Sequence, residues 1–193
     1  MSQEACSPQK YDRRTILFHW LTAAVVVFMW CGAHAIDWFP KGAWRVDARS
    51  VHILVGLALL ALVTLRMRWR ATDGARITPF PGWIGNLVRL GHGVLYGTLL
   101  AILGLGIANA WIRGDSIFGV FNIPKFGAYN AASRHALSEQ VVGWHSLCAN
   151  LLLVFAAGHA GLALFHQFGL RDHVLERMLP YRRRRGTDGK PAR

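Results

Sequence analysis

Four long, mostly apolar runs of residues constrain what this chain can fold into more than any other feature. They cover residues 15–36, 50–67, 90–112 and 140–168. An α-helix needs about 20 such residues to cross the hydrocarbon core of a bilayer. The second run is uncharged only as far as Leu65, and we expect Arg49 and Arg66 to extend it by bending their charged ends to the interface. The pattern predicts an all-α membrane protein, a four-transmembrane-helix bundle within residues 1–180, followed by a basic tail at 181–193.

Composition supports a bilayer as the main partner of this chain. Of its 193 residues, 53% are hydrophobic and 17% are charged, whereas a soluble domain usually carries about a quarter charged residues. The formal net charge is +12, which alone would permit a nucleic-acid binder. Such a domain needs a polar, water-facing surface to present its basic residues to phosphates, so we expect no nucleic-acid partner.

The basic residues flanking the four runs predict how the bundle is oriented. If the N-terminus lies inside, 16 Lys and Arg fall on the inner side and six on the outer side. This bias predicts that both termini are cytoplasmic. The run Arg182–Arg185 is then a cytoplasmic anchor at lipid headgroups.

A cleaved signal peptide is the alternative interpretation of the first run. The run follows two arginines, and Ala33-His34-Ala35 resembles a small-residue cleavage site. However, the apolar part of a signal peptide normally has about 7 to 15 residues, and His19 and Trp20 would be unusual inside one. We therefore expect the first run to be retained as a membrane span.

Five of the nine histidines lie inside the apolar runs, where an ionisable residue is costly and indicates a functional site. They are His19, His52, His92, His145 and His159. Any one of them alone could equally be a neutral imidazole that hydrogen-bonds to a neighbouring helix. The three cysteines form no C-x-x-C-H motif, so any haem would be the non-covalent b type.

Helix geometry groups four of these histidines into two pairs. His145 and His159 are 14 residues apart, which places them about 21 Å apart along one helix and within about 40° of the same face. With the predicted orientation, His19 lies at the inner depth of His159, and His52 lies at the outer depth of His145. Zinc would need further ligands that the nearby sequence lacks, whereas haem requires only two axial imidazoles. The pattern therefore predicts two haem b groups that transfer electrons.

Five segments carry a resemblance to a known family. They are YDRRTILFHWL, DWFP, SVHILVGLALLALVTLRMRWR, LGHGVLYG and GWHSLCANLLLVFAAGHAGLALFHQFGLRDHVLERMLP. Over residues 11–180 the chain resembles the bacterial cytochrome b561 family of di-haem, four-helix inner-membrane cytochromes. The resemblance implies that the haem iron ligands are His19, His52, His145 and His159. A departure from the family pattern is His34, a rival outer ligand that lies about 60° from the face of His19.

Several further polar residues are candidates for contacts with a cofactor. His92 and His166 could donate to a quinone carbonyl or a haem propionate, or could simply make interfacial contacts. Arg13, Arg14, Arg66 and Arg68 could pair with inner propionates, and Arg49 or Arg134 with outer ones, although lipid headgroup contacts are the simpler explanation. His135 and His173 lie in polar segments, where we expect them to be solvated.

The leading hypothesis is transmembrane electron transfer through two b haems, to or from the quinone pool. Family members include superoxide oxidases that reduce ubiquinone, which makes bound ubiquinone a candidate cofactor. One alternative is a haem-bearing anchor subunit of a dehydrogenase or hydrogenase complex. Another is a haem-free membrane protein whose histidines serve packing or transport. The electron donor and the oligomeric state are left open by the sequence.

Overall fold

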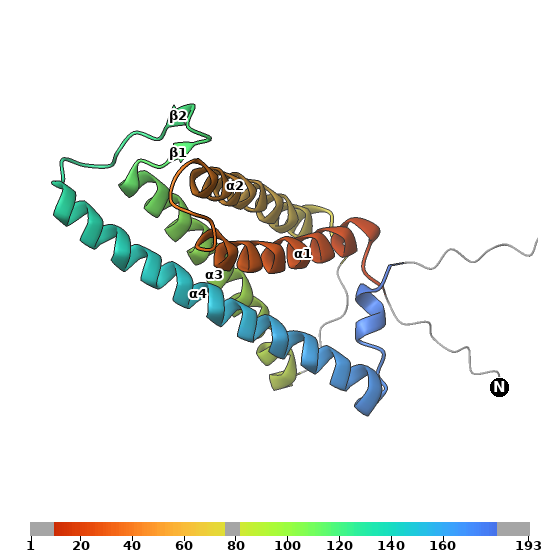
Figure 1. Cartoon of the computed structure of the whole chain (residues 1–193). Coiled ribbons are helices and arrows are strands. Elements are labelled where there is room, and N and C mark those ends of the chain that lie inside the picture. The colour runs from red at the N-terminus through yellow and green to blue at the C-terminus, as the bar shows by residue number, and fades with distance from the viewer. Residues whose placement is uncertain (1–9, 76–81, 181–193) are drawn as a thin grey trace, which may run out of the picture.

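Four long helices form the bundle that the apolar runs predict. The computed structural model describes residues 10–75 and 82–180. Its long helices are α1 (Arg13–Ile36), α2 (Ala43–Thr72), α3 (Gly82–Arg113) and α4 (Ala131–Phe165), followed by a π-helical turn (His166–Leu170) and a short 3₁₀ helix (Leu175–Met178) (Figure 1). Each of the four is long and apolar enough to cross a membrane. The predicted four-helix membrane bundle is therefore confirmed.

The two ends of the bundle differ in what covers them. At the end that we call the hairpin end, a small antiparallel hairpin joins β1 (Ser116–Ile117) to β2 (Phe121–Asn122) between α3 and α4 (Figure 1). At the opposite end, called here the termini end, the start of α1 lies beside the segment that follows α4. There the Tyr11 amide donates to the Arg177 carbonyl at 3.1 Å. Which end faces the cytoplasm stays a prediction.

Three helices begin well before the apolar runs from which they were predicted, and one of them is α3, which starts at Gly82 rather than at residue 90. α2 starts at Ala43 rather than at residue 50, and α4 starts at Ala131 rather than at residue 140. A helix starts where its first amides find acceptors, and the Asn130 side chain accepts from the Ser133 amide at 2.8 Å. Hydropathy marks only the lipid-facing part of a helix, so the polar first turns were missed.

The β1–β2 hairpin lies in the connection between the third and fourth apolar runs, for which hydropathy predicts no element. Ser50 on α2 is fully buried, and its hydroxyl accepts from the Phe118 amide at 2.9 Å. Arg134 on α4 donates to the carbonyl groups of Ile112 and Phe126 at 2.7 and 2.9 Å. These contacts fasten the α3–α4 connection onto the bundle. The basic tail predicted at residues 181–193 lies outside the described residues.

Packing divides the bundle into two helix pairs. α3 lies along α4, α1 lies along α2, and α2 and α3 make a smaller contact that joins the pairs. The buried core is one small cluster near the middle of the bundle. Its members are Leu59, Val63, Leu99, Leu103 and Leu152. Most other apolar side chains are exposed, as expected for a bundle whose outer surface faces lipid.

Asp12 ties two helices together at the termini end. Its carboxylate accepts from the amide of Thr15 at 2.9 Å, which caps α1. It also accepts from the Trp69 indole and from the Ala75 amide, both at 3.1 Å. Partial burial raises the pKa of Asp12, but these hydrogen bonds outweigh burial and hold the pKa well below its usual value.

We predict that Asp12→Ala lowers the free energy of unfolding at pH 7 by about 1–2 kcal/mol, because the α1 cap and its link to α2 are lost. Since the folded pKa is depressed, this stabilisation is fully present above the unfolded pKa of about 4 and is lost as the pH falls toward the folded value. Melting temperatures in detergent at pH 7 and pH 3 measure it. The control Asp73→Asn removes a carboxylate that accepts from Thr72 at the end of α2. An equal deficit of the Asp12 variant at both pH values would contradict the prediction.

Candidate haem-binding sites

His52 on α2 and His145 on α4 face each other across the gap between the helix pairs at the hairpin end. Their ring centroids are 6.3 Å apart. A cavity of about 340 Å³ opens beside them, with walls of largely apolar side chains from all four helices. Gly106 lies against the His145 ring, and a methyl group added there would come within 3.2 Å of Cε1. The glycine therefore allows the imidazole to lie close against α3.

One ring nitrogen of His145 is already used within the bundle. Its Nδ1 donates to the Ile102 carbonyl at 3.1 Å, so the neutral ring carries its proton on Nδ1. The lone pair of Nε2 is then available to a metal. A second partner that fixes the tautomer in this way is the usual arrangement for a metal-binding histidine.

His19 on α1 and His159 on α4 form the corresponding pair at the termini end. Their ring centroids are also 6.3 Å apart. Here Nδ1 of His19 accepts a hydrogen bond from the Arg66 guanidinium at 3.0 Å. A neutral ring with this contact carries its proton on Nε2, so a metal bound at Nε2 would require Arg66 to turn away from Nδ1.

Both pairs have the spacing that a haem with two axial histidines requires. A metal–imidazole bond is about 2 Å long and each nitrogen lies about 1 Å from its ring centre, so two axial rings have centres about 6 Å apart. Within the described part of the chain, no group of three or more His, Cys, Asp and Glu side chains could hold a metal ion by itself. A metal between these rings therefore takes its remaining ligands from another molecule, and a porphyrin supplies four nitrogens.

His92 on α3 lies next to the termini-end pair. Its ring centroid is 5.4 Å from that of His159, and its Nδ1 donates to the Val88 carbonyl of its own helix at 2.7 Å. The ring is therefore positioned beside a candidate ligand, and the donor on Nδ1 is already satisfied. The sequence offered His92 as a candidate for a cofactor contact but gave no sign of its contact with His159.

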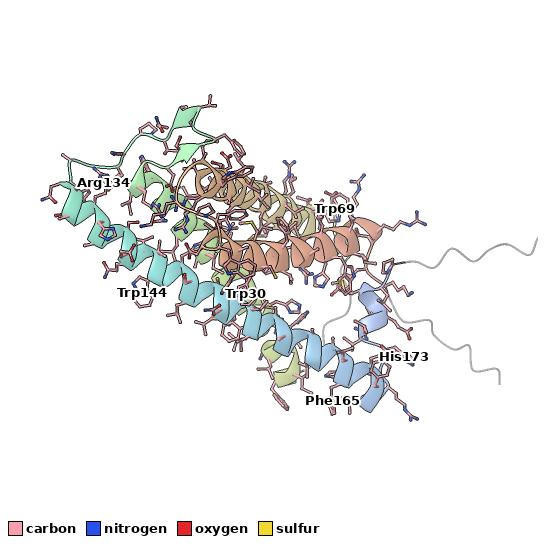
Figure 2. All side chains as sticks on the ribbon, viewed as in Figure 1. Trp30, Trp69, Arg134, Trp144, Phe165 and His173 are labelled. Carbon is pink, nitrogen blue, oxygen red and sulfur yellow. The ribbon has the colours of Figure 1, made fainter. Side chains whose placement is uncertain are left out.

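His166 occupies a separate polar cluster past the end of α4. Its Nδ1 donates to Asp172 at 2.5 Å, and nearby His173 donates to Glu176 at 2.8 Å. Slight burial raises the pKa of Asp172, but the hydrogen bond from His166 outweighs it and holds the pKa below its usual value. His173 is therefore bonded to a carboxylate rather than only to water. Figure 2 shows it well away from Trp30 in the middle of the bundle.

The arginines predicted near propionates are mostly engaged elsewhere. Arg14 stacks over the Trp69 ring at 4.6 Å, while its neighbour Arg13 is exposed. Arg49 pairs with the buried Asp115 at 3.4 Å, and Arg134 holds the connection between α3 and α4 (Figure 2). Arg66 is the predicted arginine that contacts a candidate ligand.

His34 lines the mouth of the cavity, although it is not part of the hairpin-end pair. Its Nδ1 donates to the Trp30 carbonyl at 2.9 Å, and its ring packs on the Trp30 indole with centroids 4.3 Å apart. Trp30 in turn donates to Asn150 on α4 at 2.9 Å. Sequence reasoning missed both Trp30 and Asn150, because only the fold brings α1 and α4 together here.

Comparison with known proteins identifies the family. The family model described as prokaryotic cytochrome b561 matches residues 10–181. This chain belongs to that family. It is therefore a bacterial inner-membrane cytochrome that carries b-type haem and takes part in electron transfer.

Relatives of this cytochrome match over nearly their whole length. Cytochrome b561 homolog 1 of Escherichia coli K12 is 32% identical over 90% of this chain and 99% of the relative. The probable superoxide oxidase CybB of Yersinia pestis is 28% identical over 91% and 98%. Cytochrome b562 of Cereibacter sphaeroides is 30% identical over 88% and 94%. The likeness thus covers the entire bundle rather than one helix.

We predict that Gly106→Ala weakens haem binding at the hairpin-end pair by about tenfold, because the added methyl group displaces the His145 ring. The haem retained per chain after purification, measured from the pyridine haemochrome spectrum, is the test. Gly104→Ala is the matched control, since a methyl group added there meets nothing within 4 Å. Equal haem retention in the two variants would show that the close approach at Gly106 has no role in binding.

Proposed function

We propose that this cytochrome carries single electrons across the membrane through two b haems. His52 and His145 would hold one haem, and His19 and His159 the other. The observation that carries this proposal is the equal separation of 6.3 Å within two imidazole pairs at opposite ends of the bundle. Each pair joins α1 or α2 to α4, and a largely apolar cavity of about 340 Å³ lies beside the pair at the hairpin end.

A haem with two axial imidazoles supplies a one-electron couple and leaves no iron position open to substrate. The remaining functions belong to the chain itself. The Ile102 carbonyl orients His145 and keeps its Nε2 free. Apolar side chains such as Leu99 and Leu103 line the cavity and exclude water from it.

The spacing of the pairs supports transfer from one membrane surface to the other. His145 and His159 are 14 residues apart on α4, which is about 21 Å along the helix axis. Leu152 lies midway between them within the buried core cluster. An electron would therefore pass between two sites separated by the packed aliphatic side chains of this cluster.

Ubiquinone is the proposed acceptor, at the termini end. His92 beside His159 could donate to a quinone carbonyl or to a haem propionate from Nε2 when that nitrogen carries a proton. His166, Arg13 and Arg14 lie at the same end of the bundle as further candidates. Of these, His166 already donates to Asp172, so a quinone would compete with that carboxylate.

Superoxide is the proposed electron donor, at the hairpin end. A relative of similar length is named a probable superoxide oxidase, which supports this choice. Two superoxide anions would each give up one electron and leave as dioxygen, while one ubiquinone takes up two electrons and two protons to become ubiquinol. Arg113, Lys125 and Arg134, together with the one carboxylate of Glu139, line an open cavity of about 530 Å³ at this end and provide a net positive charge for an anion.

The proposed orientation places the termini end in the cytoplasm. The excess of basic residues at this end favours it, because positively charged flanks stay on the cytoplasmic side. Residues 1–180 would form the transmembrane domain, and residues 181–193 a basic tail at the lipid headgroups.

We predict that His52→Ala and His145→Ala each lose the same haem, and that His19→Ala and His159→Ala each lose the other. Haem content should fall from two to one per chain in every case, because an axial ligand is removed from one site only. Pyridine haemochrome analysis with protein quantification measures this. His34→Ala is the control and should keep both haems. Loss of both haems from every single variant would contradict the pairing.

We expect superoxide to reduce the purified cytochrome, and ubiquinone then to reoxidise it. Dithionite-reduced spectra should first show a b-type α band. Steady-state haem reduction with superoxide, ascorbate or ubiquinol as the donor compares the candidate reactions. Rapid reduction by ascorbate with none by superoxide would reject superoxide as the donor and leave the electron-transfer role intact.

A further inference from the structure

The two histidine pairs lie in different electrostatic surroundings. At the termini end, the guanidinium of Arg66 is within 3.0 Å of His19 and lies over the Tyr96 ring at 5.2 Å from its centroid. Arg66 is half-buried on α2, one face of which packs against α1. Among the described residues no carboxylate forms an ion pair with it, so its positive charge is not offset locally.

The hairpin-end pair has no such cation in contact with it. The cavity beside His52 and His145 is lined by no Lys or Arg among the described residues, and its one charged lining residue is Asp37. Arg49 lies one helical turn before His52, but its guanidinium faces the buried carboxylate of Asp115 at 3.4 Å. Arg113 contacts the same carboxylate at 3.3 Å. A carboxylate therefore partly offsets the positive charge near this pair.

Arg66 stays close to the termini-end site even if a metal occupies Nε2 of His19. In that state Nδ1 carries the proton, and the guanidinium must leave it. The side chain is anchored on α2 beside the ring, and the face of Tyr96 already accepts it. The other partner available to a guanidinium there is a haem propionate, which it would neutralise. Both positions keep a positive charge beside the cofactor.

We propose that Arg66 makes the termini-end haem the easier of the two to reduce, so that electrons flow from the hairpin end to the termini end. The inference rests on the proposed two-haem function. Reduction removes one positive charge from the iron, and a cation in a poorly screened site favours the reduced form. One electron moves per event: the hairpin-end iron is oxidised from ferrous to ferric and the termini-end iron is reduced from ferric to ferrous. No bond forms or breaks, and no proton is transferred.

Equilibrium redox titration of the purified holoprotein tests this role of Arg66 as a positioning residue. The wild type should titrate in two one-electron waves. His52→Ala should lose the hairpin-end haem, so the wave that remains in this variant belongs to the termini-end haem. Arg66→Gln should lower the ratio of reduced to oxidised termini-end haem at a fixed potential by about tenfold, which is a shift of about 59 mV for one electron. The hairpin-end wave should stay in place. Arg66→Lys keeps the charge and should retain most of the wild-type ratio.

Arg68→Gln is the matched control, because it removes the same charge from the same end of α2 at an exposed position. In this variant the ratio of reduced to oxidised haem should change by less than about twofold at either site, because exposed charges are screened. Equal shifts in Arg66→Gln and Arg68→Gln, or a termini-end wave that titrates below the hairpin-end wave in the wild type, would overturn the inference. A wild-type haem content of one per chain would instead contradict the proposed function itself.

Discussion

The absence of water from the hydrocarbon core is the constraint on which this structure depends. Backbone amides and carbonyls must hydrogen-bond to one another there, so the chain crosses as four helices. Any functional group inside the membrane must therefore come from a side chain. Imidazoles are costly in that setting unless they have a partner. His19 and His159, like His52 and His145, meet across the gap between the two helix pairs, where a shared cofactor would satisfy both rings.

The limited packing of the bundle follows from the same constraint. Lipid covers the outer surface, so a central cluster around Leu99 and Leu152 provides the buried core, and the two histidine pairs lie on either side of it. Contacts at both ends compensate for this small core. Asp12 joins α1 to α2 at one end, and Ser50 and Arg134 hold the hairpin at the other. Such anchors keep the gap open while its walls stay apolar.

Charge distinguishes the two ends more than shape does. Both pairs have the same ring separation, yet Arg66 contacts one of them, whereas Arg49 near the other pairs with Asp115. In a medium of low dielectric constant even a half-buried cation has a large effect on a nearby redox centre. Two sites built from the same ligand type can therefore differ in function through one neighbouring side chain. A cytochrome that spans a membrane needs such a difference if electrons are to move mainly in one direction.

The sequence by itself determined the four spans, and it predicted that the two histidines of each pair lie at the same membrane depth. Hydropathy and helical rise follow from the order of residues along the chain and do not depend on which helices touch. The sequence also identified the family, which the comparisons confirm. Only the tertiary structure decided that His92 lies against His159, that Arg66 reaches His19, and that Gly106 makes room for His145. These contacts join residues from different helices, and their formation depends on how each helix is rotated about its axis. The sequence missed the hairpin and the polar first turns of α2 and α4 for a related reason: capping and cross-chain hydrogen bonds start these elements, and hydropathy does not record them.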